Sequence, residues 1–208
     1  MNFSHLLNQL LGSAQKSIGQ SGTADTITKV GGGAAAIGLL SMFLGRKGGS
    51  QLAKVGSLAA LGSLAYQAYK NYQHDKPQTT NMDLPATAFE PVAHNVEDTS
   101  KLILRTMIAA AAADGAIDER EKQLIMNEIG NDVETQQWIL QEMARPATVQ
   151  EIAKQIGDDT ALASEIYLAA RMVSADLSRK EIVFLAQLAQ ALKLDDALVE
   201  QLEKQAGF

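Results

Sequence analysis

The segment Met107-Ile-Ala-Ala-Ala-Ala-Ala-Asp-Gly-Ala-Ile-Asp-Glu-Arg-Glu121 decides the fold class of this 208-residue chain. Its alanine-rich run has high helix propensity and stops at Asp114-Gly115, where glycine permits a left-handed turn. A second helix opens at Asp118, whose side chain can cap the backbone while Glu121, three positions on, bonds back. The stretch therefore predicts a helix, an acidic turn and a capped helix.

The same arrangement recurs in Tyr167-Leu-Ala-Ala-Arg-Met-Val-Ser-Ala-Asp-Leu-Ser-Arg-Lys-Glu181, with a turn two residues shorter. Further capping-box signatures, Thr148…Glu151 and Ser178…Glu181, each precede an apolar run with helical period. Apolar residues make up 46% of the chain but aromatic residues only 5%, so alanine and the aliphatic side chains dominate. We predict an all-α fold, with about seven helices over residues 97–208.

These motifs also carry a family resemblance. The run Ala113–Glu121, together with Ser174-Ala175-Asp176 and the stretch Glu181-Ile-Val-Phe-Leu-Ala-Gln-Leu-Ala, resembles the YebE-like bacterial inner-membrane proteins of unknown function. The carboxy-terminal half of that family is similar to the tellurite-resistance TerB-like helical domain. The resemblance implies a membrane-associated protein with a TerB-like helical bundle over residues 97–208 and an acidic metal site, and it supplies no established reaction.

The acidic turns are the candidate metal site. Three carboxylates lie around the first turn, and the second turn adds two more if the halves pack face to face. Oxygen-only ligands of this kind suit Ca²⁺, Mg²⁺ or Mn²⁺. The expected ligands are Asp114, Asp118, Glu121, Asp176 and Glu181.

Helix capping explains the same residues without a metal. Asp118 and Glu121 satisfy the requirements of a capping box, and Asp114 can accept hydrogen bonds from nearby backbone amides. The spacing is also not that of an EF-hand, because the twelve-residue ligand pattern with its terminal glutamate is missing. Both interpretations, capping and metal binding, stay open at this point.

The first third of the chain has a different charge balance. Residues 1–72 carry six Lys/Arg and one acidic residue, whereas residues 97–208 carry eleven Lys/Arg and twenty Asp/Glu. Val30–Gly45 and Val55–Tyr69 are uncharged, with Lys or Arg at their flanks and tyrosines near the second end. We expect residues 29–72 to anchor the protein in membrane lipid, as a single span or a hairpin. The alternative is a helical pair packed on the main domain.

The remaining segments connect these parts. Residues 1–28 are expected to form a short amphipathic helix, with Phe3, Leu6, Leu7 and Leu10 on one face, followed by a polar segment. Residues 73–96 carry three prolines and no sustained apolar period, which predicts an extended, mobile linker. We expect a bacterial inner-membrane location with residues 97–208 in the cytoplasm.

Composition excludes several function classes. The absence of cysteine rules out disulfides, thiolate metal sites and a cysteine nucleophile. A pI near 5.1 argues against nucleic-acid binding, which needs clustered Lys/Arg. No nucleophile with a neighbouring histidine base is recognisable, so we expect no enzymatic activity. A metal-assisted hydrolase using Asp114, Asp118 and Asp176 is the one catalytic alternative.

The sequence thus favours a membrane-anchored helical module that binds an unidentified protein partner, with a divalent cation at its acidic turns. Small residues at four-residue spacing, such as Gly32/Ala36 and Gly56/Ala60, also suggest homo-oligomers through close helix contacts. The alternative function is a soluble, metal-binding stress protein whose amino-terminal helical pair oligomerises.

Overall fold

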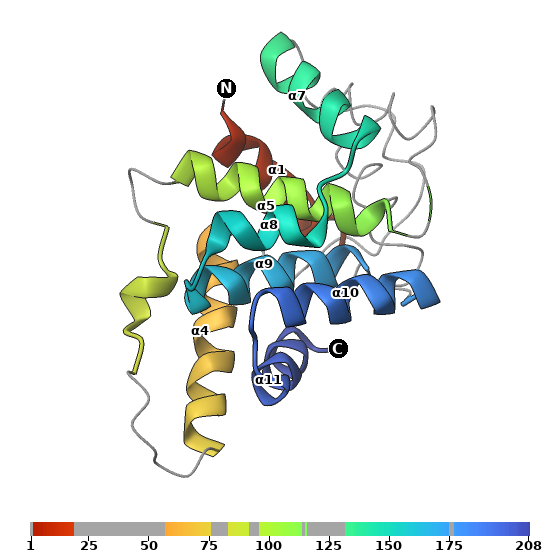
Figure 1. Ribbon diagram of the computed structural model, residues 1–208. Coiled ribbons are helices and arrows are strands. Elements are labelled where there is room, and N and C mark those ends of the chain that lie inside the picture. Colours follow the sequence, from red (N-terminus) through yellow and green to blue (C-terminus); the bar gives the residue numbers. More distant parts are fainter. Residues whose placement is uncertain are drawn as a thin grey trace.

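The computed structural model describes residues 2–18, 57–75, 83–91, 96–113, 115, 132–174 and 177–208. Every regular element in these ranges is helical, which confirms the all-α prediction (Figure 1). The elements are α1 (Phe3–Ile18), α4 (Leu58–Asp75), the short 3-10 helix η1 (Ala86–Phe89), α5 (Val96–Ala111), α7 (Val133–Ala144), α8 (Val149–Ile156), α9 (Thr160–Val173), α10 (Arg179–Ala191) and α11 (Asp196–Ala206).

Helix α9 is the centre of the core. It contacts α4, α5, α8, α10 and α11, so it is covered on nearly all sides, as Figure 1 shows. Its side chains Ile166 and Leu168 are fully buried, and Ala163, Ala169 and Ala170 allow neighbouring helices to approach closely. A helix that is apolar around most of its circumference is expected to lie inside a helical protein.

The predicted capping boxes are confirmed at two helix starts. Thr148 caps α8 and Ser178 caps α10; in each case the glutamate three positions on bonds back to the capping residue's backbone. Helix α10 ends at Ala191, and Lys193 after it adopts a left-handed backbone with φ of 57°. The third predicted box, Asp118…Glu121, lies outside the described residues.

Helix α4 corrects the interpretation of the second uncharged segment. Its Leu61, Ala65 and Ala68 are completely buried, and its main partners are α11 and α9. Tyr69 and Tyr72, expected to mark a membrane interface, are buried against protein. The sequence lacks charge here because this face of the helix lies in a protein core. Of the two interpretations, a helix packed on the main domain describes α4; the first segment, Val30–Gly45, lies outside the described residues.

The linker and the first helix also pack on the core. Residues 83–91 were expected to be extended, yet η1 lies against α4 and α9, and Phe89 is 2% exposed. Helix α1 confirms the predicted amphipathic helix, but its leucines face α5 and α4. Glu97 of α5 accepts a hydrogen bond of 2.6 Å from the backbone N–H of Phe3 and so caps α1.

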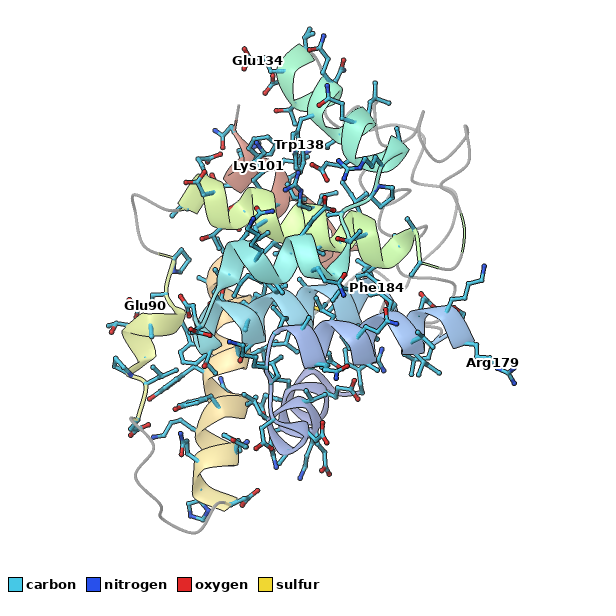
Figure 2. All side chains as sticks on the ribbon, viewed as in Figure 1. Glu90, Lys101, Glu134, Trp138, Arg179 and Phe184 are labelled. Atoms are coloured by element: carbon cyan, nitrogen blue, oxygen red, sulfur yellow. The ribbon has the colours of Figure 1, made fainter. Side chains whose placement is uncertain are left out.

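A cation–π contact joins three helices near the amino-terminal end of α1. The ammonium of Lys101 on α5 lies 5.3 Å from the ring centroid of Phe3 and 5.4 Å from that of Trp138. Figure 2 shows Lys101 beside Trp138 at the contact between α5 and α7. Helices α1, α5 and α7 are therefore held together by one basic and two aromatic side chains.

Candidate functional site

The predicted metal ligands are only partly covered by the described residues. Asp114, Asp118, Glu121 and Asp176 lie outside them. Glu181 is described and buried, and its carboxylate accepts a 2.7 Å hydrogen bond from the backbone N–H of Ser178. Within the described ranges, no group of three His, Asp or Glu side chains is arranged to hold a metal ion. The metal site therefore stays a prediction, and the structure assigns Glu181 a capping contact.

A groove lined by residues of α10 and α11 is a candidate site within the described part of the chain. It encloses about 770 Å³ and is open to solvent. Most of its lining is aliphatic, and the rest is polar or charged. It is lined by Tyr167, Leu177, Ile182, Leu185, Ala186, Ala189, Gln190, Lys193, Leu194, Asp196, Val199 and Glu203.

Two helix caps and a tight turn build this groove. Ser178 fixes the start of α10, and Asp195 fixes the start of α11 by accepting a 2.9 Å bond from the backbone N–H of Ala197. Lys193, with φ of 57°, lies in the turn that connects α10 to α11, and residues of both helices line the groove. Leu177 stands before the α10 cap with φ of 45°, a backbone conformation that a leucine rarely adopts.

Two aliphatic side chains of the groove are exposed. Leu177 is 38% exposed and Ile182 is 50% exposed. Arg179, between them in sequence, projects away from the body of the molecule at the start of α10 (Figure 2). Exposed aliphatic side chains that line a groove mark a surface suited to binding another apolar group.

A polar cluster in the groove centres on one carboxylate oxygen of Glu203. The Tyr167 hydroxyl donates a 2.8 Å bond to Glu203 Oε1, and Arg171 Nε donates a 3.2 Å bond to the same oxygen. Burial, together with this bond, raises the pKa of the Tyr167 phenol well above its usual value. The Arg171 guanidinium also stacks 3.8 Å from the ring centroid of Phe208. Tyr167 therefore stays protonated and acts as a fixed donor.

Two acidic side chains of α11 also line the groove. Asp196 and Glu203 lie two turns apart on α11, and both line the groove. The neighbouring Lys193 ammonium is engaged outside it, in a 2.7 Å pair with Asp158. Lys193 is therefore not paired with Asp196, while Glu203 keeps its pair with Arg171.

A second polar feature lies where η1 crosses α4. Glu165 of α9 is 6% exposed, and burial raises the pKa of its carboxyl to about 8, with a further contribution from Asp159. A β-carbon placed on Gly62 would meet both Glu165 Oε1, at 3.1 Å, and the Phe89 carbonyl oxygen, at 2.0 Å. A buried carboxyl group therefore lies at the point where three elements meet.

A family model matches residues 29–206, which is most of the chain. The chain belongs to the DUF533 family of proteins of unknown function. Searches of curated proteins and of solved structures each found no significant match. The α10–α11 groove and the Gly62–Glu165 contact both lie within the part of this DUF533 member that the family model covers.

None of the described helices of this DUF533 member has the length and hydropathy required to cross a membrane.

Sequence reasoning missed the α10–α11 groove. A signal for it was present, because Ile182, Val183, Phe184 and Leu185 are consecutive in a helix. Four successive positions point around the whole circumference, so one buried stripe cannot accommodate all of them.

Proposed function

We propose that this DUF533 member is a protein-binding helical module that receives an apolar segment of its partner in the α10–α11 groove. The observation that supports the proposal is the exposure of Leu177 and Ile182 on the groove wall, at 38% and 50%. Apolar surface rimmed by polar residues is typical of sites where another protein docks. Capping by Ser178 and Asp195 supports a groove that is formed before the partner arrives, which lowers the entropy cost of binding.

Site-specific photo-crosslinking tests this proposal in living cells. A photoreactive amino acid at Gln190, which lines the groove, is expected to give a discrete crosslinked adduct with the full-length protein. Ile182→Asp should abolish the adduct, because a carboxylate on the groove wall opposes apolar docking. Val133→Asp is the matched control, since Val133 is 59% exposed on α7 and does not line the groove.

An adduct that survives Ile182→Asp, or one that Val133→Asp abolishes equally, contradicts the groove as the binding site. Both variants change exposed residues, so their folded fraction should equal that of the unmodified protein by circular dichroism.

The second part of the proposal is attachment to the bacterial inner membrane. With α4 inside the core, the segment left to meet lipid is Val30–Gly45, which is uncharged and flanked by Lys29 and Arg46. Helices α1 and α4 precede and follow it and share one core, which supports a segment that leaves and returns on the same side of the bilayer. Its sixteen residues fall short of the roughly 20 that one crossing needs, which favours partial insertion.

The proposal also places residues 97–208 in the cytoplasm. It includes the likeness of these residues to TerB-like helical domains. Carbonate extraction of membranes is the test. The full-length protein should remain in the pellet, and Leu39→Asp combined with Leu40→Asp should release it. Thr23→Asp, a similar change in the polar stretch before the segment, should not. Release of the unmodified protein by carbonate would overturn the membrane part and leave the groove proposal standing.

A further inference from the structure

The walls of the α10–α11 groove determine which kind of polypeptide fits it. Both walls are helices whose backbone N–H and C=O groups are used in their own hydrogen bonds, so no strand edge is offered to an extended peptide. Tyr167 is the one aromatic side chain of the lining and is only 3% exposed, whereas grooves for proline-rich peptides are lined with exposed aromatic rings. What remains is docking of a helix through its side chains.

The spacing of the α10 lining agrees with a helical occupant. Ile182, Ala186 and Ala189 follow one another at intervals of four and three residues and form a single stripe along α10. The two alanines make their part of the stripe shallow, so larger side chains of a second helix can fill it. Leu177 and Val199 add further aliphatic lining to the groove.

The acidic side chains that line the groove indicate which charge the occupant carries. Asp196 and Glu203 are separated by two helical turns, about 10 Å along α11. Arg171 and Tyr167 both bind Oε1 of Glu203, and among the described residues no donor reaches Oε2 of Glu203 or the Asp196 carboxylate. Lys193 is held by Asp158. A cation on the occupant can therefore reach the Asp196 carboxylate and the second oxygen of Glu203, whose first oxygen is paired with Arg171.

We infer that the partner segment is an amphipathic α-helix that carries an Arg or Lys side chain facing Asp196 and Glu203. This inference rests on the proposed function and adds the chemistry of the partner to it. The apolar stripe of the partner helix lies over Ile182, Ala186 and Ala189, and its basic side chain lies over α11. Complementary charge then sets the orientation of the helix in the groove.

Peptide binding to the full-length protein tests the inference. The probe is a helical peptide of about sixteen residues built from Ala and Gln, with Leu at helical spacing and two Arg residues beside the leucine stripe. The comparison peptide carries citrulline in place of Arg, which keeps the shape and removes the charge. Because the chain has no cysteine, Gln190→Cys can carry a single fluorophore that reports entry into the groove.

The arginine peptide should bind with a Kd on the order of 0.1 mM. Asp196→Asn should weaken it about two- to fivefold, as expected for a partly exposed ion pair, and should leave the citrulline peptide unaffected. Glu200→Gln is the matched control, because Glu200 is an exposed acid of the same helix that does not line the groove. It should change neither affinity.

Four results would overturn the inference. Equal binding of both peptides, lost in Ile182→Asp, would show an apolar groove without a basic requirement and would leave the proposed function intact. No binding of either peptide at millimolar concentration would exclude a helical occupant of this class. Dimerisation of the protein that Ile182→Asp abolishes would identify the occupant as a second copy. If Asp196→Asn and Glu200→Gln weakened binding of the arginine peptide equally, the effect would come from the overall negative charge of α11 and not from a specific contact with Asp196.

Discussion

Gly62 of α4 lies directly against the backbone of Phe89, so closely that a β-carbon at position 62 would come within 2.0 Å of the Phe89 carbonyl oxygen. The rings of Tyr66 and Tyr69 lie 5.5 and 5.6 Å from the Phe89 ring, centroid to centroid, and hold the segment in place on either side. The contact between α4 and η1 therefore depends on the absence of a side chain at one position.

Replacing Gly62 with alanine should lower the stability of the protein, whereas the same change in an exposed helix raises it. In an exposed helix, Gly→Ala stabilises by about 1 kcal/mol because alanine loses less backbone entropy. Here Gly62→Ala should destabilise the protein by about 1–3 kcal/mol, since the backbone of η1 has to move. Chemical denaturation measures the change. Asn71→Ala, on the exposed side of the same helix, should stay within about 0.5 kcal/mol, and a stabilised Gly62→Ala protein would refute the close contact.

The buried carboxyl of Glu165 should make stability depend on pH. Its pKa is raised from 4.5 to about 8, first by burial and then by Asp159, so the folded state binds this proton more tightly than the unfolded state. The stabilising contribution is complete below pH 4.5 and is lost as the pH rises to about 8. We expect Glu165→Gln to match the unmodified protein near pH 5 and to exceed its stability by a few kcal/mol above pH 8.

Melting curves of the Glu165→Gln variant and the unmodified protein across this pH range provide the measurement. Parallel curves for the two proteins would show that Glu165 is ionised in the folded state throughout. Glu203→Gln is not a suitable control, because Glu203 carries the Tyr167 and Arg171 bonds; Glu200→Gln changes an exposed acid and should leave the pH dependence unaltered.

Two ion pairs should differ in strength because they differ in burial. Arg105 Nε donates 3.0 Å bonds to both carboxylate oxygens of Glu142, whose side chain is only 7% exposed. Arg105→Ala leaves this buried carboxylate without its partner and should cost about 2–4 kcal/mol. The pair of Arg145 and Glu151 is exposed, so Arg145→Ala should cost less than about 1 kcal/mol. Similar losses for the two variants in urea denaturation would contradict the ranking.

The predicted metal site has a direct thermal test. Calcium or manganese at millimolar concentration should raise the melting temperature of the full-length protein if Asp114, Asp118, Glu121 and Asp176 act as ligands, because a bound ion stabilises the folded state. Asp118→Asn should reduce this shift, whereas Asp98→Asn, at an exposed acid in the first turn of α5, should preserve it. An unchanged melting temperature would remove the metal site and leave capping as the role of these acids.

Features that depend on residues close together in the chain, such as helix caps, were predictable from the sequence. The boxes Thr148…Glu151 and Ser178…Glu181 were recognisable because a capping residue and its reciprocal glutamate are three positions apart. The position of α4 was not predictable in the same way. Its uncharged face is compatible with lipid or with protein, and its main partner, α11, lies far along the chain. The groove was missed because its walls come from two helices, although the run Ile182–Leu185 signalled excess apolar surface.

The pairing of α4 with α11 sets an order of events during synthesis. Gln201 and Gln205 of α11 donate hydrogen bonds of 3.1 and 2.5 Å to Asp75 and Gln67 of α4, so the contact joins an early helix to the last one. At 5–20 residues per second, the roughly 120 residues between the two helices take roughly 6–24 s to translate. During that interval the nascent chain carries the apolar face of Leu61, Ala65 and Ala68 without its partner. A ribosome-bound chaperone or the bilayer surface can therefore engage α4 before its own carboxy terminus does.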